Sequence, residues 1–78
     1  MEKKLIFQYD REGDILYINK CSPYAEQDSE EIGDGVIARL NKATGDIESL
    51  EVLFFSTRLF RSDLLELPVT MDFHSVKP

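Results

Sequence analysis

Cysteine and histidine, the usual ligands of structural zinc, are scarce in this sequence, which has one cysteine, Cys21, and one histidine, His74, among its 78 residues. A structural zinc site takes four ligands, mostly cysteines and histidines, so one chain cannot assemble a site of that kind. Cys21 also has no second cysteine with which to form a disulfide. A catalytic pair of these two residues would depend on His74, which lies near a chain end. We therefore expect no metal, no cofactor and no catalytic residue, with Cys21 half-buried and His74 exposed.

Long apolar runs are also missing. No segment approaches the roughly 20 apolar residues that a membrane helix needs. The start, MEKKLIFQYD, has neither a continuous apolar core nor a small-residue cleavage site, so it does not predict a signal peptide. We expect a cytoplasmic protein with no membrane partner.

Basic residues are outnumbered, because 15 acidic residues against 9 basic ones leave a formal charge of -6. Such a charge repels phosphate, so we expect no nucleic-acid partner. A basic protein is the partner that this charge would attract. A chain of this length forms one small domain and buries only about 60 to 65% of the surface that its unfolded form exposes. A partner, or a second copy in a homodimer, could supply further burial.

Alternation of apolar and polar residues is the dominant pattern, and it predicts strands. The run LIFQY places Leu5, Phe7 and Tyr9 on one face, and the run ILYIN is partly apolar on both faces. Between them, DREGD contains Gly13, which can adopt a positive φ without steric cost, and aspartates that can accept hydrogen bonds from the turn. Residues 4–20 are therefore predicted to form a first hairpin.

A second segment repeats this arrangement. The residues LNKATGDI at 40–47 match YDREGDI at 9–15 with one extra residue, and both read apolar, Asx, basic, spacer, Gly-Asp-Ile. The runs GVIARL and IESLEVLFF flank the second copy, so residues 35–55 are predicted to form a second hairpin. The polar and acidic residues 21–34 predict a solvated connection that could pair weakly at residues 25–31.

The last third of the chain changes character. The run STRLFRSDLLEL predicts a short helix at about residues 56–65, with Ser56 as its cap. The run LPVTMDF alternates cleanly and predicts a final strand at about residues 67–73, paired within the chain or with a second copy. Of Phe54 and Phe55, which cannot face the same side of a strand, one should lie on a second buried face or at an exposed interface.

These elements predict one α+β domain over residues 1–78. Its sheet would be small and antiparallel, with four or five strands built from two hairpins and one short helix after the fourth strand. Packing the helix on the apolar face is the usual way to bury one side of a small sheet.

Three carboxylates at alternate positions, Asp10, Glu12 and Asp14, have the spacing that opens a calcium-binding loop. Such a loop needs a glycine at its sixth position and a bidentate acid at its twelfth, and here those positions hold Ile15 and Cys21. We therefore interpret the segment as a polar hairpin tip whose acids face water.

Three motifs carry a resemblance to a known family. They are the pattern YD-x-E-x-D-x-LYI at residues 9–18, DGVI at residues 34–37 and LEVL at residues 50–53. They resemble the small bacterial proteins called domain of unknown function 2283, over about residues 5–55. Asn41 and Ser49 depart from the aspartate and glycine that are common there. The resemblance implies a fold and no catalytic residue. Because members are sometimes encoded beside small ribonuclease-like toxins, it also implies an antitoxin or accessory binding partner.

Two classes of function fit these features. The first is a non-catalytic protein-binding module that meets a basic partner, such as a ribonuclease-like toxin, by strand addition or charge. Its candidate contacts are the acids Asp10, Glu12, Asp14, Glu30, Glu31 and Asp34. The second is a small-ligand-binding or enzymatic domain that uses Tyr9, Tyr17 and nearby carboxylates in a cleft between two copies. An open edge and a flat acidic face would favour the first class, which is our working hypothesis.

Overall fold

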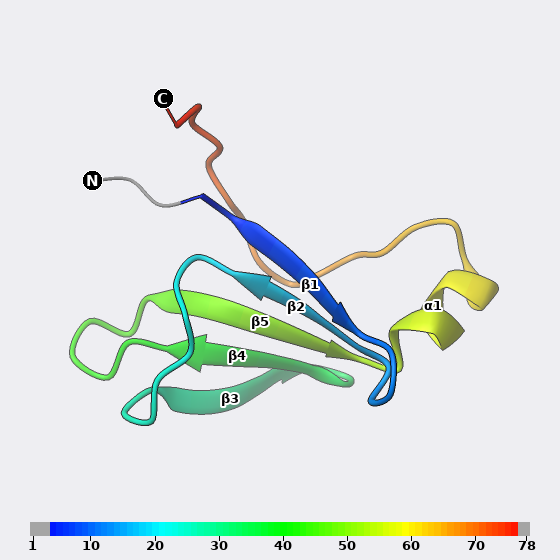
Figure 1. Cartoon of the computed structure of the whole chain (residues 1–78), viewed down its shortest axis with the longest axis horizontal. Coiled ribbons are helices and arrows are strands. Elements are labelled where there is room, and N and C mark those ends of the chain that lie inside the picture. Colours follow the sequence, from blue (N-terminus) through cyan, green and yellow to red (C-terminus); the bar gives the residue numbers. More distant parts are fainter. Residues whose placement is uncertain (1–3, 77–78) are drawn as a thin grey trace.

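The computed structural model describes residues 4–76, in which a five-stranded antiparallel sheet is followed by one short helix (Figure 1). The elements are β1 (Ile6–Asp10), β2 (Ile15–Asn19), β3 (Asp28–Gly33), β4 (Val36–Leu40), β5 (Ile47–Leu53) and α1 (Phe55–Arg61). Their order across the sheet is β1-β2-β5-β4-β3, so β1 and β3 are its two edges. The predicted α+β class is confirmed. Over the described part of the chain, no helix has the length and apolar character needed to cross a membrane.

Both predicted hairpins form, β1 with β2 and β4 with β5. The acidic connection is more ordered than expected, because its second half becomes β3, which pairs antiparallel with β4. Acidic residues have low intrinsic strand propensity, but here they lie on an edge where their carboxylates stay in water while the backbone bonds to β4. This extra strand places the helix after the fifth strand rather than after the fourth, which corrects the prediction.

Within the single chain, residues 67–73 do not form the predicted final strand, and pairing of this segment with a second copy stays a prediction. That segment runs from α1 back across the sheet toward the N-terminal end of β1 (Figure 1). Leu65, Leu67 and Val69 pack against the core, while the intervening Glu66 and Pro68 are exposed. The alternation therefore serves contact with the face of the sheet, which needs the same period of two as a strand but no ladder of hydrogen bonds.

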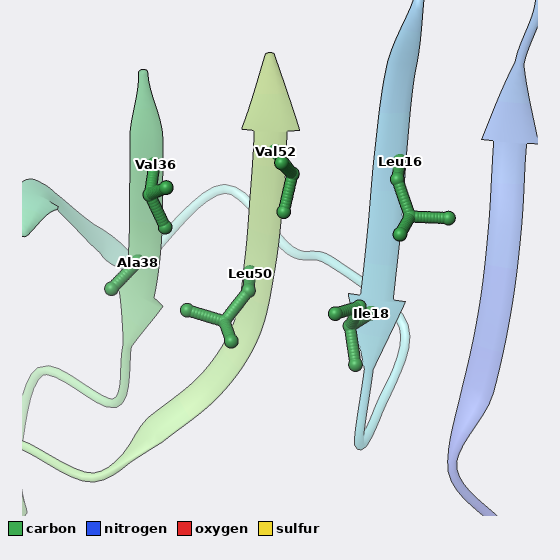
Figure 2. Packing of buried hydrophobic residues seen from close by; sticks show 6 residues of the cluster. All are labelled: Leu16, Ile18, Val36, Ala38, Leu50 and Val52. Atoms are coloured by element: carbon green, nitrogen blue, oxygen red, sulfur yellow. The ribbon is translucent and has the colours of Figure 1, made fainter. Parts of the chain in front are cut away.

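The core lies on one face of the three central strands, β2, β5 and β4 (Figure 2). It consists of six buried apolar side chains, Leu16, Ile18, Val36, Ala38, Leu50 and Val52. The register aligns Leu16, Val52 and Val36 in one row across the strands, and Ile18, Leu50 and Ala38 in the next. Burial of these contiguous apolar side chains is the main force that holds the sheet to its covering segment.

The repeated turn motif has the same hydrogen bonds in both copies. Asp10 Oδ1 accepts from the backbone N–H groups of Glu12 and Gly13 at 3.1 and 3.3 Å, as Asn41 Oδ1 accepts from those of Ala43 and Thr44 at 2.9 and 3.0 Å. Each Asx side chain thus closes its own turn, as the sequence predicts.

The positive φ of the first turn falls on Asp14, at 56°, instead of on Gly13. Glycine is favoured at position 13 for a different reason. A Cβ at that position would lie 2.9 Å from Asp10 Oδ2, so a side chain would collide with the carboxylate that closes the turn.

Helix α1 is shorter than the predicted segment 56–65, because the backbone at Ser62 is already extended. Its N-cap residue is Phe54, in the left-handed conformation and without a side-chain capping bond, so Ser56 is not the cap. Phe54 is 65% exposed, whereas Phe55 packs against the core. As expected, the two phenylalanines do not share one environment, and one of them is exposed.

Candidate functional site

Asp14 is held by three groups that come from β1 and α1. The Tyr9 hydroxyl donates to Asp14 Oδ1 at 2.6 Å, and the Ser56 backbone N–H donates to the same oxygen at 2.9 Å. The Ser56 hydroxyl donates to Asp14 Oδ2 at 2.7 Å. The Tyr9 hydroxyl, followed by the two Ser56 groups, holds the pKa of Asp14 below its ordinary value, and the Asp14 carboxylate raises the pKa of Tyr9. Asp14 thus anchors the helix to the first turn.

The other two acids of the first turn differ from each other. Asp10 closes the turn, as described above, whereas the side chain of Glu12 is exposed and makes no hydrogen bond within residues 4–76. Two of the three acids predicted to meet a partner at this tip are therefore engaged by the fold itself.

The acids of the second group lie on β3 and on the turn that follows it. Glu31 Oε2 accepts from the Gly35 N–H at 3.3 Å and so closes the β3–β4 turn. Glu30 is exposed, and in the described part of the chain its carboxylate has no hydrogen bond or ion pair. The Asp34 side chain is exposed as well, while its backbone carbonyl accepts from Arg58 Nη2.

The two acidic groups share one end of the sheet but do not form one site. Because β1 and β3 run in the same direction, both turns lie at the end where β5 leads into α1 (Figure 1). Arg58 lies between them, since its guanidinium donates to the carbonyls of Asp34 and Leu53, the latter at 2.8 Å from Nε. The structure therefore separates the predicted acids into two edges with a cation between them.

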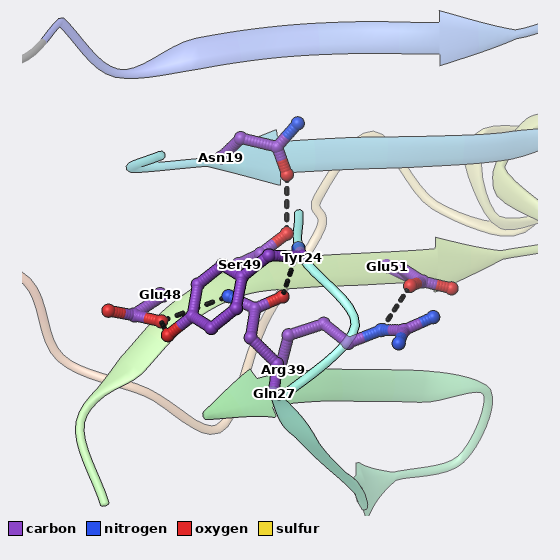
Figure 3. A network of polar contacts seen from close by, with 7 residues as sticks. All are labelled: Asn19, Tyr24, Gln27, Arg39, Glu48, Ser49 and Glu51. Atoms are coloured by element: carbon purple, nitrogen blue, oxygen red, sulfur yellow. Dashed lines mark hydrogen bonds and ion pairs between the residues drawn. The ribbon is translucent and has the colours of Figure 1, made fainter. Parts of the chain in front are cut away.

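A polar network that the sequence analysis missed lies on the face opposite the core (Figure 3). Tyr24 and Gln27, from the acidic connection, donate to Glu48 Oε1 at 2.6 and 2.9 Å, and Asn41 Nδ2 lies 3.3 Å from Glu48 Oε2. Ser49 donates to Asn19 beside them. The Glu48 carboxylate raises the pKa of Tyr24 to about 12, and the Tyr24 hydroxyl lowers that of Glu48. This network fixes the connection to the sheet.

A bulge explains how Glu48 reaches these partners. Arg39 pairs with Ser49 and Leu40 with Ile47, so Glu48 is the extra residue of β5. Bulges re-aim side chains in this way. A sequence pattern of period two cannot reveal an inserted residue, and the partners of Glu48 are up to 24 residues away.

The two tyrosines of the alternative cleft, which is predicted to lie between two copies, do not share a face of the sheet. Tyr9 pairs with Leu16 and Tyr17 pairs with Gln8, so the two tyrosine side chains project to opposite faces of the sheet. Cys21 is half-buried and His74 exposed, as expected. Among the residues from 4 to 76, no group of three or more potential metal ligands occurs.

Comparison with known families gives a match to the model of a protein family of unknown function, DUF2283, over residues 6–56. The chain belongs to this family. The matched region begins at β1 and ends at Ser56, so it contains the whole sheet together with the partner of Asp14. No curated protein and no solved structure matches the chain.

Proposed function

We propose that the protein is a non-catalytic protein-binding module that receives a basic segment of another protein along β3. The observation that carries this proposal is the outer edge of β3, which in residues 4–76 pairs only on its inner side, with β4. Its side chains from Asp28 to Glu31 are all exposed. An unpaired edge offers a row of backbone donors and acceptors to an added strand.

The acids flank this edge on both faces. Glu30 pairs with Ala38 of the core, so its carboxylate lies on the core side, whereas Glu31 pairs with Ile37 and lies on the other side. An added strand with lysine or arginine would therefore meet a carboxylate on either face. The one described ion pair joins Arg39 to Glu51 at 2.7 Å, so the nearest cation on β4 is already engaged.

The same acids decide which partners are rejected. Charged side chains on an edge strand discourage pairing with neutral or acidic strands, because the carboxylates would lose water or meet like charge. A basic segment would instead bring opposite charges to the carboxylates, so its pairing with the edge is favoured. The family resemblance supports one particular form, an antitoxin-like role in which the acidic edge covers the RNA-binding surface of a basic ribonuclease-like protein.

The titratable groups support a non-catalytic role. General acids and bases work best with a pKa near neutrality. The tyrosine–carboxylate pairs move away from it, because the pKa values of Tyr9 and Tyr24 are raised while those of Asp14 and Glu48 are lowered. Such pairs keep each proton on the tyrosine and serve as fixed hydrogen bonds.

The test is capture of binding proteins at low salt with the tagged chain, followed by calorimetric titration of the captured partner at several salt concentrations. The variant Asp28→Asn/Glu30→Gln removes two charges from the edge. We expect it to weaken binding by roughly tenfold and to flatten the salt dependence. If the partner cleaves RNA, the unaltered protein should inhibit it more strongly than the variant does.

A matched control removes charge elsewhere. The variant Glu12→Gln neutralises an exposed acid on the turn that follows the opposite edge, so it should bind the partner almost as well as the unaltered protein. Equal loss in both variants, or an affinity that salt leaves unchanged, would refute binding along β3.

A further inference from the structure

The second edge strand, β1, has the opposite character to β3. In the described residues it pairs only with β2, and its exposed side chains are largely apolar. Ile6 is 56% exposed on one face, and Phe7 and Tyr9 are 61% and 41% exposed on the other. An edge of this kind attracts another strand unless charge protects it, and β1 has no acid before its last residue, Asp10.

We propose that β1 is a self-association surface, at which two copies of the chain pair their β1 strands antiparallel about a two-fold axis through Phe7. The pairing extends to Lys4 and Leu5, which directly precede β1. The two five-stranded sheets then become one continuous sheet, and the same patch serves both copies, as a two-fold interface requires.

The sequence of β1 is complementary to itself in this register. Phe7 lies opposite the partner's Phe7 and Leu5 opposite the partner's Tyr9, which joins apolar side chains on the core face. Ile6 lies opposite Gln8 on the other face. At each end Lys4 lies opposite the partner's Asp10, so charges of opposite sign meet twice. Aromatic pairs, aromatic–aliphatic pairs and opposite charges are the cross-strand pairs that stabilise antiparallel sheets.

The register shifted toward the C-terminal end of β1 is less favourable. Centring the axis on Gln8 would place Ile6 opposite the partner's Asp10 and Leu5 opposite the partner's Arg11, so two apolar side chains would face charges. The axis through Phe7 avoids both contacts.

The surface beside β1 also fits a second copy. A groove lined in part by Leu5, Met71, Phe73 and Val76 lies at the N-terminal end of the strand. Phe73 is largely exposed there. The register brings the partner's Tyr9 opposite Leu5, at the rim of this groove. The ring of Tyr9 contacts Phe55 with centroids 5.7 Å apart, so an aromatic pair faces the groove.

Salt distinguishes this association from the binding of a basic partner. Each copy has a formal charge of -6, so added salt screens the mutual repulsion of two copies and should preserve or strengthen their association. Binding of a basic segment along β3 should weaken under the same conditions. Failure of one proposal is therefore visible independently of the other.

Sedimentation velocity over a range of protein concentrations tests the proposal. We expect the unaltered chain to form dimers, and Phe7→Glu, which places two carboxylates opposite each other at the axis, to weaken dimerisation by roughly tenfold or more. Phe60→Glu makes the same change at an exposed helical position and should leave the dimer intact. A monomeric unaltered chain at all concentrations, or equal effects of the two variants, would overturn the proposal.

Cross-linking tests the register. In a Cys21→Ser background, Phe7→Cys places two thiols directly opposite each other, and mild oxidation should yield a covalent dimer. In the same background Gln8→Cys places the two cysteines diagonally, with Cα atoms about 7 to 8 Å apart, beyond the reach of a disulfide. Efficient cross-linking through Gln8→Cys and none through Phe7→Cys would reject the axis through Phe7.

Discussion

Asp14 and Ser56 lie 42 residues apart in the sequence and are joined by two hydrogen bonds, from the backbone N–H and from the hydroxyl of Ser56. The contact fastens the first residues of α1 to the β1–β2 turn. The Phe55 N–H strengthens it by donating to the Asp14 carbonyl at 3.0 Å. The helix, which has no buried residue of its own, is thus positioned at its beginning.

This contact should make stability depend on pH. The pKa of Asp14 is below its ordinary value of 3.8 in the folded state, so its stabilisation is complete above that value and is lost as the pH falls through the folded pKa. The variant Asp14→Asn tolerates the positive φ but has no charge. Urea unfolding at a series of pH values measures the free energy of unfolding of the unaltered protein and of Asp14→Asn. The unaltered protein should be the more stable, by an amount that is largest above about pH 4 and shrinks in acid.

Glu12→Gln is the control for this measurement, because Glu12 is exposed and its side chain makes no hydrogen bond in the described residues. Its unfolding curve should follow that of the unaltered protein at each pH. A constant difference between Asp14→Asn and the unaltered protein, from neutral to acidic pH, would contradict the role given to the carboxylate.

Tyr24 should ionise later than an ordinary tyrosine. The Glu48 carboxylate raises its pKa to about 12, so the hydrogen bond contributes stability below the ordinary value of 10.0 and is lost as the pH rises through about 12. An alkaline titration followed by ultraviolet absorbance should show a late step. Tyr24→Phe should remove the step near pH 12, whereas a step that survives there in Tyr24→Phe would assign it to another residue.

Truncation of a core side chain should destabilise the sheet strongly. Leu50 lies in the buried row between Ile18 and Ala38, so Leu50→Ala should lower the free energy of unfolding by about 2 to 5 kcal/mol. Phe60 is 91% exposed, and Phe60→Ala should change the free energy of unfolding by less than about 0.5 kcal/mol. Urea unfolding measures both. Similar losses in the two variants would mean that the helix is packed more closely than its exposure indicates.

The segment after α1 should contribute to stability although it forms no strand. Leu67→Asp puts a charge where the segment packs against the core, and should lower the free energy of unfolding by about 1 to 3 kcal/mol. Thr70→Asp makes a similar change at an exposed position of the same segment and is the control. If both variants unfolded like the unaltered chain, residues 67–70 would not be packed on the sheet in solution.

Local chemistry made the turns and hairpins predictable. Asp10 and Asn41 bond to backbone groups two and three residues later, so the sequence around each contains the whole interaction. The features that sequence analysis missed depend on distant residues. Asp28 to Gly33 form a strand because β4 offers an edge, and Ser56 bonds to Asp14 because the sheet brings β5 beside β2.

Leu67 and Val69 illustrate a different limit. Their alternation correctly indicated which side chains face the protein, but a period of two is shared by a paired strand and by an extended segment lying on a sheet. Only the position of the neighbouring backbone decides between the two. The same reasoning applies to Glu48, whose orientation depends on one residue inserted relative to β4.

The two edge strands differ in character, because β1 is apolar and β3 is acidic. This difference also limits how many chains can join into one sheet. Two chains joined through β1 would present β3 at both outer ends, and these ends have like charge and repel each other. A third chain would find no apolar edge to extend. A protein with two apolar edges would risk building filaments. Pairing through β1 would instead end at two chains, and it would leave two identical acidic edges available to other molecules.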